Sequence, residues 1–144
     1  MKRRTVLLTG ATGYIASHTW LTLLSAGYAV VGVDDFSNSS ASVLERVEHL
    51  AGSEPVFERA DVCDNTTLQR LFRAHVPDAV IHFAARKAVG ESVATPLVYY
   101  SNNLGALFSV CQAMQASGCQ RIVFSSSATV YGVPERLPIA EDDP

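Results

Sequence analysis

A glycine-rich turn near the amino terminus joins a strand-like segment to a helix-like one. Residues 6–8 form a short apolar run, and residues 10–16 then read GATGYIA. Gly10 lets the chain turn tightly off the strand, and Gly13 lets backbone N–H groups approach a phosphate without an intervening Cβ. The helix that begins there directs the positive end of its dipole at the phosphates. This order of elements is typical of a dinucleotide-binding protein.

An acidic residue ends the next apolar run. Asp34 comes 24 positions after Gly10, close to the spacing of about 20 expected for a carboxylate that binds the adenosine ribose. A carboxylate there repels the extra phosphate of NADP, and no Arg or Lys follows until Arg46. We therefore expect NAD as the cofactor. Ala16 replaces the third glycine of the usual motif, which tolerates alanine. The alternative is an ordinary glycine-rich turn without a ligand.

Strand-like and helix-like segments alternate along the rest of the chain. Strands are expected at residues 29–34, 56–58, 79–83 and 121–125, and helices at residues 14–26, 42–50, 65–75 and 96–117, with an irregular loop after residue 131. Thr95, before Pro96, is the expected N-cap of the last helix. The alternation predicts an α/β fold of the Rossmann type, with a doubly wound parallel sheet in the order 3-2-1-4-5. We expect residues 1–144 to form one NAD-binding domain, truncated after about five strands.

Composition argues against several other classes of protein. The net charge is −3 and basic residues form no stripe, so nucleic acid is not an expected partner. No apolar run approaches the ~20 residues of a membrane span, and the first run is too short for a signal peptide. Cys63, Cys111 and Cys119 are odd in number and lack metal-ligand spacing. We expect a cytoplasmic protein with reduced thiols, no metal site and no membrane contact.

Two polar segments follow the expected fourth and fifth strands. Residues 82–92 read HFAARKAVGES, and residues 125–127 are three serines. Ligands of doubly wound sheets bind beyond the carboxyl ends of the strands, so hydroxyls there could hold a sugar oxygen. Serines that merely turn the chain are the alternative. His82 is expected to be a core histidine rather than a catalyst, and residues 99–100 (YY) to serve in packing or in a subunit contact.

These motifs together resemble the extended short-chain dehydrogenase/reductases. The resemblance runs from residue 5 to about residue 132 and rests on the glycine turn, residues 34–39 (DDFSNS), residues 87–92 (KAVGES) and the serines. Within that family the chain is most similar to the nucleotide-sugar 4-epimerases. Related dehydratases carry an Asp-Glu pair where this chain has Ala128 and Thr129. The resemblance implies transient oxidation of a UDP-hexose at carbon 4 by bound NAD, in a homodimer of the full-length enzyme.

The resemblance also implies roles for individual residues. Gly10, Gly13, Tyr14, Ile15 and Ala16 would cradle the pyrophosphate. Asp34, Asn38 and Ser39 would lie at the adenosine ribose and its phosphates, with Asp61 and Val62 at the adenine. Phe83, Ala84, Ala85, Lys87, Asn102 and Ser125 would line the rest of the cofactor. Ser127 would be catalytic through a hydrogen bond to the reacting sugar hydroxyl, and Ser127 and Lys87 would bind substrate.

The family's catalytic Tyr-Lys pair is missing from these residues. The tyrosines are Tyr14, Tyr28, Tyr99, Tyr100 and Tyr131, and none has a Lys four positions later. By family spacing the pair and the substrate-binding lobe would lie beyond residue 144. We therefore expect the amino-terminal part of an epimerase that is inactive alone. The alternatives are a non-catalytic NAD-binding module, half of a split enzyme, or a related nucleotide-sugar reductase or dehydratase.

Overall fold

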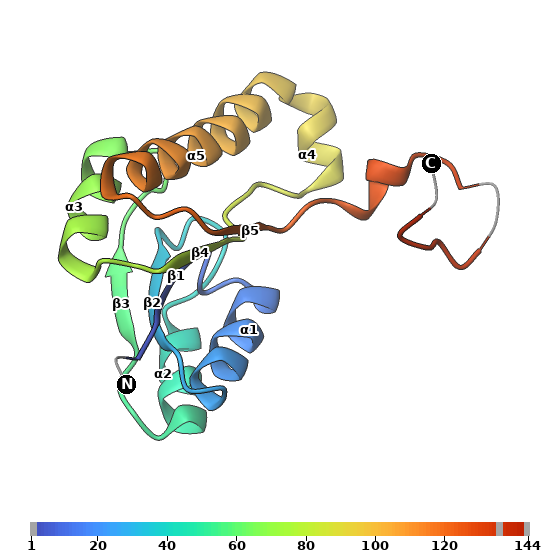
Figure 1. The fold of residues 1–144 in the computed structure, drawn as a ribbon. Helices are drawn as coiled ribbons and strands as arrows, with labels where there is room; N and C mark the ends of the chain where they lie inside the picture. Colours follow the sequence, from blue (N-terminus) through green and yellow to red (C-terminus); the bar gives the residue numbers. More distant parts are fainter. Residues whose placement is uncertain (1–2, 135–136, 143–144) are drawn as a thin grey trace.

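The computed structural model describes residues 3–134 and 137–142, and it forms a three-layer α/β fold (Figure 1). The elements are β1 (Thr5–Thr9), α1 (Tyr14–Ser25), β2 (Ala29–Asp34), α2 (Ser42–Ala51), β3 (Val56–Arg59), α3 (Asn65–His75), β4 (Ala79–His82), α4 (Val89–Ala94), α5 (Pro96–Ser117), β5 (Ile122–Phe124) and a 3₁₀ helix (Ala128–Tyr131). The strands are parallel in the order β3-β2-β1-β4-β5. The predicted doubly wound sheet and its strand order are thus confirmed.

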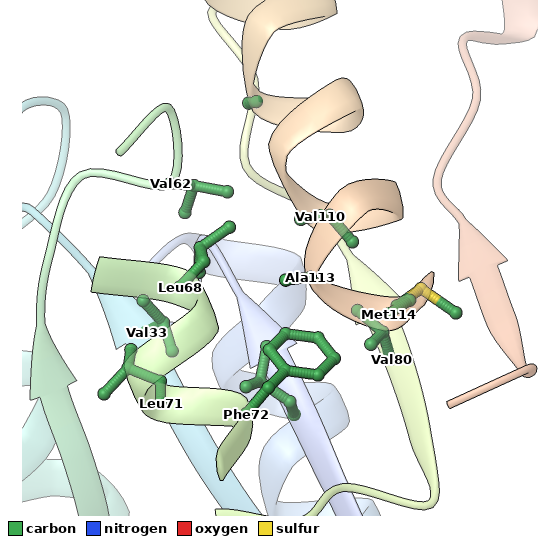
Figure 2. Close-up of a cluster of buried hydrophobic side chains, with 11 residues drawn as sticks. Val33, Val62, Leu68, Leu71, Phe72, Val80, Val110, Ala113 and Met114 are labelled. Carbon is green, nitrogen blue, oxygen red and sulfur yellow. The ribbon is translucent and has the colours of Figure 1, made fainter. Parts of the chain in front are cut away.

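Helices cover both faces of the sheet, with α1 and α2 on one side and α3 and α5 on the other (Figure 1). Successive residues of β1 point to opposite faces, so Leu7 and Leu8 belong to different apolar clusters. The cluster under α3 and α5 holds Leu7, Val33, Val62, Leu68, Leu71, Phe72, Val80, Ala106, Val110, Ala113 and Met114. Figure 2 shows side chains of both helices meeting Val33 and Val80 of the sheet. Coverage of both faces explains why each central strand contains a continuous apolar run.

The opposite cluster is built around Trp20 of α1, whose side chain is fully buried. Its indole lies directly over Gly32 in the middle of β2, and a Cβ built at Gly32 would overlap Cη2 and Cζ3 of the ring. Glycine weakens a strand in isolation. Here it provides the space in which the largest side chain of the core packs against the sheet.

Two features differ from the sequence-based expectations. Residues 89–94 form the short helix α4, which was not predicted. Thr95 does not cap α5 with its side chain, contrary to expectation. Its Oγ1 instead donates a hydrogen bond to the carbonyl of Glu91 at 3.0 Å and closes the end of α4. A threonine hydroxyl can satisfy either the helix that precedes it or the one that follows, and local sequence does not decide between them.

The edge strand β5 is exposed, whereas its neighbour β4 is covered. Ile122, Val123 and Phe124 all keep substantial solvent exposure, and Val80 of β4 is fully buried.

Within residues 3–134 and 137–142, no helix is long and apolar enough to cross a bilayer.

Substituting Gly32 by alanine tests the packing of Trp20. The added Cβ overlaps the buried indole, so we expect the free energy of unfolding to fall by ~2–3 kcal/mol, as for other overpacked cores. Urea denaturation followed by tryptophan fluorescence measures this change. Gly90→Ala is the matched control because a Cβ at Gly90 meets nothing within 4 Å, and its effect should stay within ~1 kcal/mol. Equal effects of the two variants would contradict this account.

Candidate functional site

A cavity of about 320 Å³ opens at the carboxyl edge of β1, β2 and β4. Its walls are the β1–α1 turn, the loops that follow β2 and β3, and the irregular segment after β4, and α5 closes one side. Its lining residues are Gly10, Gly13, Asp34, Asp35, Ser37, Asn38, Ser39, Ala60, Asp61, Val62, Cys63, Phe83, Ala84, Ala85, Arg86, Lys87, Ala88, Glu91, Tyr99, Asn102 and Ala106. This is the edge at which doubly wound sheets bind ligands.

The β1–α1 turn needs glycine at its first position for two reasons. Gly10 has a φ of +64°, a left-handed conformation that side chains disfavour. A Cβ there would also lie 2.8 Å from the backbone nitrogen of Ala84. The N–H of Gly13 then donates to the carbonyl of Gly10 at 3.0 Å, and α1 begins at the next residue. The amino terminus of α1 therefore faces the cavity without a capping side chain and favours an anion.

Asp34 is nearly buried, and protein groups already hold its carboxylate in place. The N–H of Thr12 donates to Oδ2 at 3.1 Å, the N–H of Phe36 donates to Oδ1 at 2.9 Å, and the hydroxyl of Ser39 donates to Oδ1 at 3.2 Å. Phe36 adopts a φ of +63° to make its contact; this conformation is rare for a bulky residue and is concentrated at functional sites. Donors from the β1–α1 turn and the β2–α2 loop thus fix the carboxylate at the cavity wall.

Residues 83–88 form one wall of the cavity, between β4 and α4. Arg86 of this wall pairs with Glu91 of α4 at 3.6 Å, and the hydroxyl of Tyr99 in α5 donates to Glu91 at 2.7 Å. The hydrogen bond to Glu91 raises the pKa of Tyr99. Tyr99 therefore stays protonated and serves as a donor that ties α5 to α4 rather than as a base.

Two groups with shifted pKa values lie in or next to the site and are uncharged near neutral pH. Cys63 lines the cavity, and His82 precedes the lining residue Phe83 in the chain. Burial, with a smaller contribution from Asp61, raises the pKa of Cys63 to about 11. Burial lowers the pKa of His82 to about 4. His82 stacks on Phe124 and shares a 2.7 Å hydrogen bond with the hydroxyl of Thr9. As expected from the sequence, His82 is a core histidine with its hydrogen-bonding partner.

The structure brings most of the expected cofactor residues to this one cavity. Gly10, Gly13, Asp34, Asn38, Ser39, Asp61, Val62, Phe83, Ala84, Ala85, Lys87 and Asn102 all line it. Tyr14 and Ile15 do not line it, and their side chains are exposed; Ala16 packs beside Trp20 in the core. Ser125 and Ser127 also lie outside the lining. The N–H of Ser125 donates to the carbonyl of His82, and the carbonyl of Ser127 accepts from Val130 within the 3₁₀ helix.

Other lining residues were not predicted. Cys63, Arg86, Glu91 and Tyr99 line the cavity. Arg86 and Glu91 lie in residues 82–92, and the polar character of that segment was the sequence signal that could have identified them. Nothing in the sequence connected Cys63 or Tyr99 with a ligand. Among the residues that the structure describes, no group of His, Cys, Asp or Glu side chains could hold a metal ion, and Cys63, Cys111 and Cys119 are free thiols.

A glycine turn at a helix terminus, a fixed carboxylate after β2 and a cavity at the switch point of the sheet define a nucleotide-binding α/β protein. The model of the NAD dependent epimerase/dehydratase family matches residues 6–144, and the chain belongs to this family. The expected similarity to nucleotide-sugar 4-epimerases is also confirmed by individual relatives.

Curated relatives are named UDP-glucose 4-epimerase. That of Bacillus subtilis is 53% identical over 139 residues, which cover 96% of this chain and 41% of the relative. That of Mus musculus is 50% identical over 145 residues, covering 96% and 42%. The crystal structure of the Bifidobacterium longum enzyme in complex with NAD⁺ and UDP has a TM-score of 0.93 at 48% identity, covering 97% of this chain and 42% of that one. The chain thus spans about two fifths of these relatives' length.

The buried imidazole of His82 predicts a specific pH dependence of stability. The unfolded chain takes up a proton near pH 6.5, whereas the folded chain takes it up near pH 4. Folding with a neutral imidazole therefore carries no penalty above pH 6.5. As the pH falls from 6.5 toward 4, the free energy of unfolding decreases, by at most about 3 kcal/mol for this group. Chemical denaturation at a series of pH values measures this decrease. In His82→Gln, which keeps an acceptor for Thr9, the free energy of unfolding should decline less steeply as the pH falls. His49→Gln, at an exposed position, controls for the loss of a histidine. If stability declined as steeply in His82→Gln as in the wild type, His82 would not be the source of the pH dependence.

Proposed function

We propose that this chain belongs to a UDP-glucose 4-epimerase and that residues 1–144 form its NAD-binding domain. The observation that carries the proposal is the single cavity that joins the Gly10 turn, the fixed Asp34 carboxylate and the Lys87 segment. NAD, when bound, supplies the acceptor and donor of the hydride at carbon 4 of the UDP-hexose. Relatives that are 50% and 53% identical to this chain over the aligned residues carry that enzyme name.

The residues of the cavity fit a dinucleotide. The bare amino terminus of α1 suits the pyrophosphate, because its N–H groups and its dipole favour an anion. The carboxylate of Asp34 suits the hydroxyls of the adenosine ribose, to which it can accept hydrogen bonds. Asn38, Ser39, Asp61 and Val62 complete this end of the cavity. At the other end, Lys87 and Asn102 bring polar groups toward the middle of the cofactor, where Phe83 to Ala85 supply a close backbone surface.

The sugar chemistry needs groups beyond this cavity. Ser127 is proposed to hydrogen-bond the sugar hydroxyl that loses its proton, with Lys87 as a second substrate contact. The proton itself is taken, in enzymes of this kind, by a tyrosine whose pKa is lowered by a nearby lysine. No tyrosine of this chain has a lysine four positions later. We therefore infer that the 144 residues bind the cofactor and that a catalytic Tyr-Lys pair from outside them completes the site.

The proposed enzyme acts in the cytoplasm, in galactose metabolism. One observation supports the compartment: the three cysteines are free thiols, and such thiols persist where glutathione keeps them reduced.

Ligand binding tests the proposed cofactor directly. The purified 144-residue chain should bind NAD in isothermal titration calorimetry and bind NADP at least about tenfold more weakly, because the Asp34 carboxylate repels the added phosphate. Asp34→Asn should weaken NAD binding by about tenfold to a hundredfold through loss of charge-assisted hydrogen bonds. Glu48→Gln removes an exposed carboxylate of α2, away from the cavity, and should leave both affinities unchanged. The same preparation should not convert UDP-galactose to UDP-glucose.

Each result discriminates between the possible functions. Absence of NAD binding by the folded chain would contradict the proposed cofactor domain. Normal turnover of UDP-galactose would contradict the need for a Tyr-Lys pair from elsewhere. Restoration of turnover only when a separate protein is added would identify half of a split enzyme.

We also infer that the enzyme is a homodimer joined through α5. Leu97, Tyr100, Leu104, Phe108 and Cys111 recur at three- and four-residue spacing on this helix, and all are exposed. The opposite side of the same helix already packs in the core. We call these five residues the outer stripe of α5. A helix that is apolar on both sides is normally buried on both sides, and the same stripe on a second copy of the chain offers a matching apolar surface.

Sedimentation velocity tests the outer stripe of α5. The 144-residue chain should self-associate as its concentration rises, and the double variant Leu104→Lys/Phe108→Lys should remain monomeric because it places charges in the contact. Leu50→Lys, at an exposed apolar position on α2, should associate like the wild type. A wild-type chain that stays monomeric at every concentration would contradict the proposed contact.

A further inference from the structure

Residues 83–88 line the cavity along their whole length, yet they belong to no helix or strand. We call this segment the cavity wall. An irregular segment has no ladder of hydrogen bonds to fix its path, so its backbone groups need other partners. In this protein two side chains from distant elements provide them, Thr9 at the end of β1 and Asn103 in α5.

Thr9 holds the beginning of the cavity wall. Its backbone carbonyl accepts from the N–H of Phe83 at 3.2 Å, and its Oγ1 accepts from the N–H of Ala84 at 3.3 Å. The hydroxyl is fully buried and lies 2.7 Å from Nδ1 of His82. Because burial keeps the imidazole neutral, Nδ1 can accept the proton of the hydroxyl while Oγ1 accepts from Ala84. The threonine is thereby oriented by His82 and in turn orients the wall.

Asn103 holds the middle of the cavity wall. Its Oδ1 accepts from the backbone N–H of Arg86 at 2.8 Å, and its Nδ2 donates to the backbone carbonyl of Arg86 at 3.1 Å. One amide group therefore satisfies both backbone groups of a residue in an irregular segment. Arg86 lies between Ala85 and Lys87, both of which line the cavity. A fixed peptide at Arg86 constrains the direction in which these two neighbours face.

We propose that Thr9 and Asn103 are positioning residues that hold the cavity wall in the conformation that binds NAD. The proposal rests on the proposed function and adds to it the two side chains that preorganise the site. Neither is among the residues that line the cavity. A wall that must be ordered during binding weakens affinity, because part of the interaction energy is spent on fixing its backbone.

Paired substitutions separate this role from a general loss of stability. Thr9→Val and Asn103→Leu remove the anchoring groups at nearly constant volume, whereas Thr9→Ser keeps the hydroxyl and Asn103→Asp keeps the acceptor for Arg86. Amide hydrogen exchange is measured on each variant without ligand, and the Kd for NAD is measured by calorimetry. We expect faster exchange at Ala84 in Thr9→Val and at Arg86 in Asn103→Leu, with NAD binding about tenfold weaker in each. Thr9→Ser should keep the exchange rate and the Kd for NAD of the wild type. For Asn103→Asp, both values should lie between those of the wild type and those of Asn103→Leu.

Asn65→Leu is the matched control for the asparagine substitution. Asn65 also joins two elements through its amide, with Nδ2 2.8 Å from Oε1 of Gln112 on α5, and it does not line the cavity. This variant should lose stability without any change in the Kd for NAD. Unchanged exchange at both Ala84 and Arg86, or faster exchange with an unchanged Kd, would overturn the proposal. Failure of the wild type to bind NAD would instead contradict the proposed function, and the exchange rates would still report whether the two side chains hold the wall.

Discussion

The site depends on the contact between the β1–α1 turn and the backbone that follows β4. Gly10 approaches Ala84 so closely that a single added carbon would lie 2.8 Å from its backbone nitrogen. This contact sets the position of the amino terminus of α1 relative to the cavity wall. Side chains that line the cavity from β2, from the loop after β3 and from α5 are then arranged around two backbone segments that already touch. The glycine is therefore needed for packing between distant segments as well as for a tight turn.

Asp34 presents a charged carboxylate at the cavity, whereas burial keeps two titratable groups nearby, Cys63 and His82, in their neutral forms. The carboxylate of Asp34 accepts hydrogen bonds from Thr12, Phe36 and Ser39, and these donors stabilise its charge. Cys63 and His82 are titratable groups in the same region, and burial shifts the pKa of each toward the uncharged form. Cys63 therefore contributes an uncharged thiol to the lining of the cavity, and His82 keeps a neutral imidazole at the end of β4, outside that lining.

The fold was predictable because its signals are local and periodic. Continuous apolar runs such as residues 29–34 indicate strands covered on both faces, and the bounds of α3 were predicted at Asn65 and His75, as observed. Helix α4 carries no such signal, because its six residues contain a glycine and none of them is buried. Helix α5 was found by its length and its flanking Pro96 and Gly118. Its apolar residues occupy both sides, however, so periodicity could not tell the core face from the outer stripe of α5.

The anchors of the cavity wall lay beyond sequence reasoning for a different reason. Thr9 and Ala84 are 75 positions apart, and Asn103 meets Arg86 across 17 positions that include a helix. Hydrogen bonds of this kind follow from the register between β1 and β4 and from the rotation of α5 about its axis, both of which are tertiary properties. A glycine motif identifies where phosphates can approach a backbone, but the path of an irregular wall depends on which polar side chains tertiary packing brings to it. In this protein, packing along β1 and α5 thus determines the shape of a site whose lining residues lie largely elsewhere.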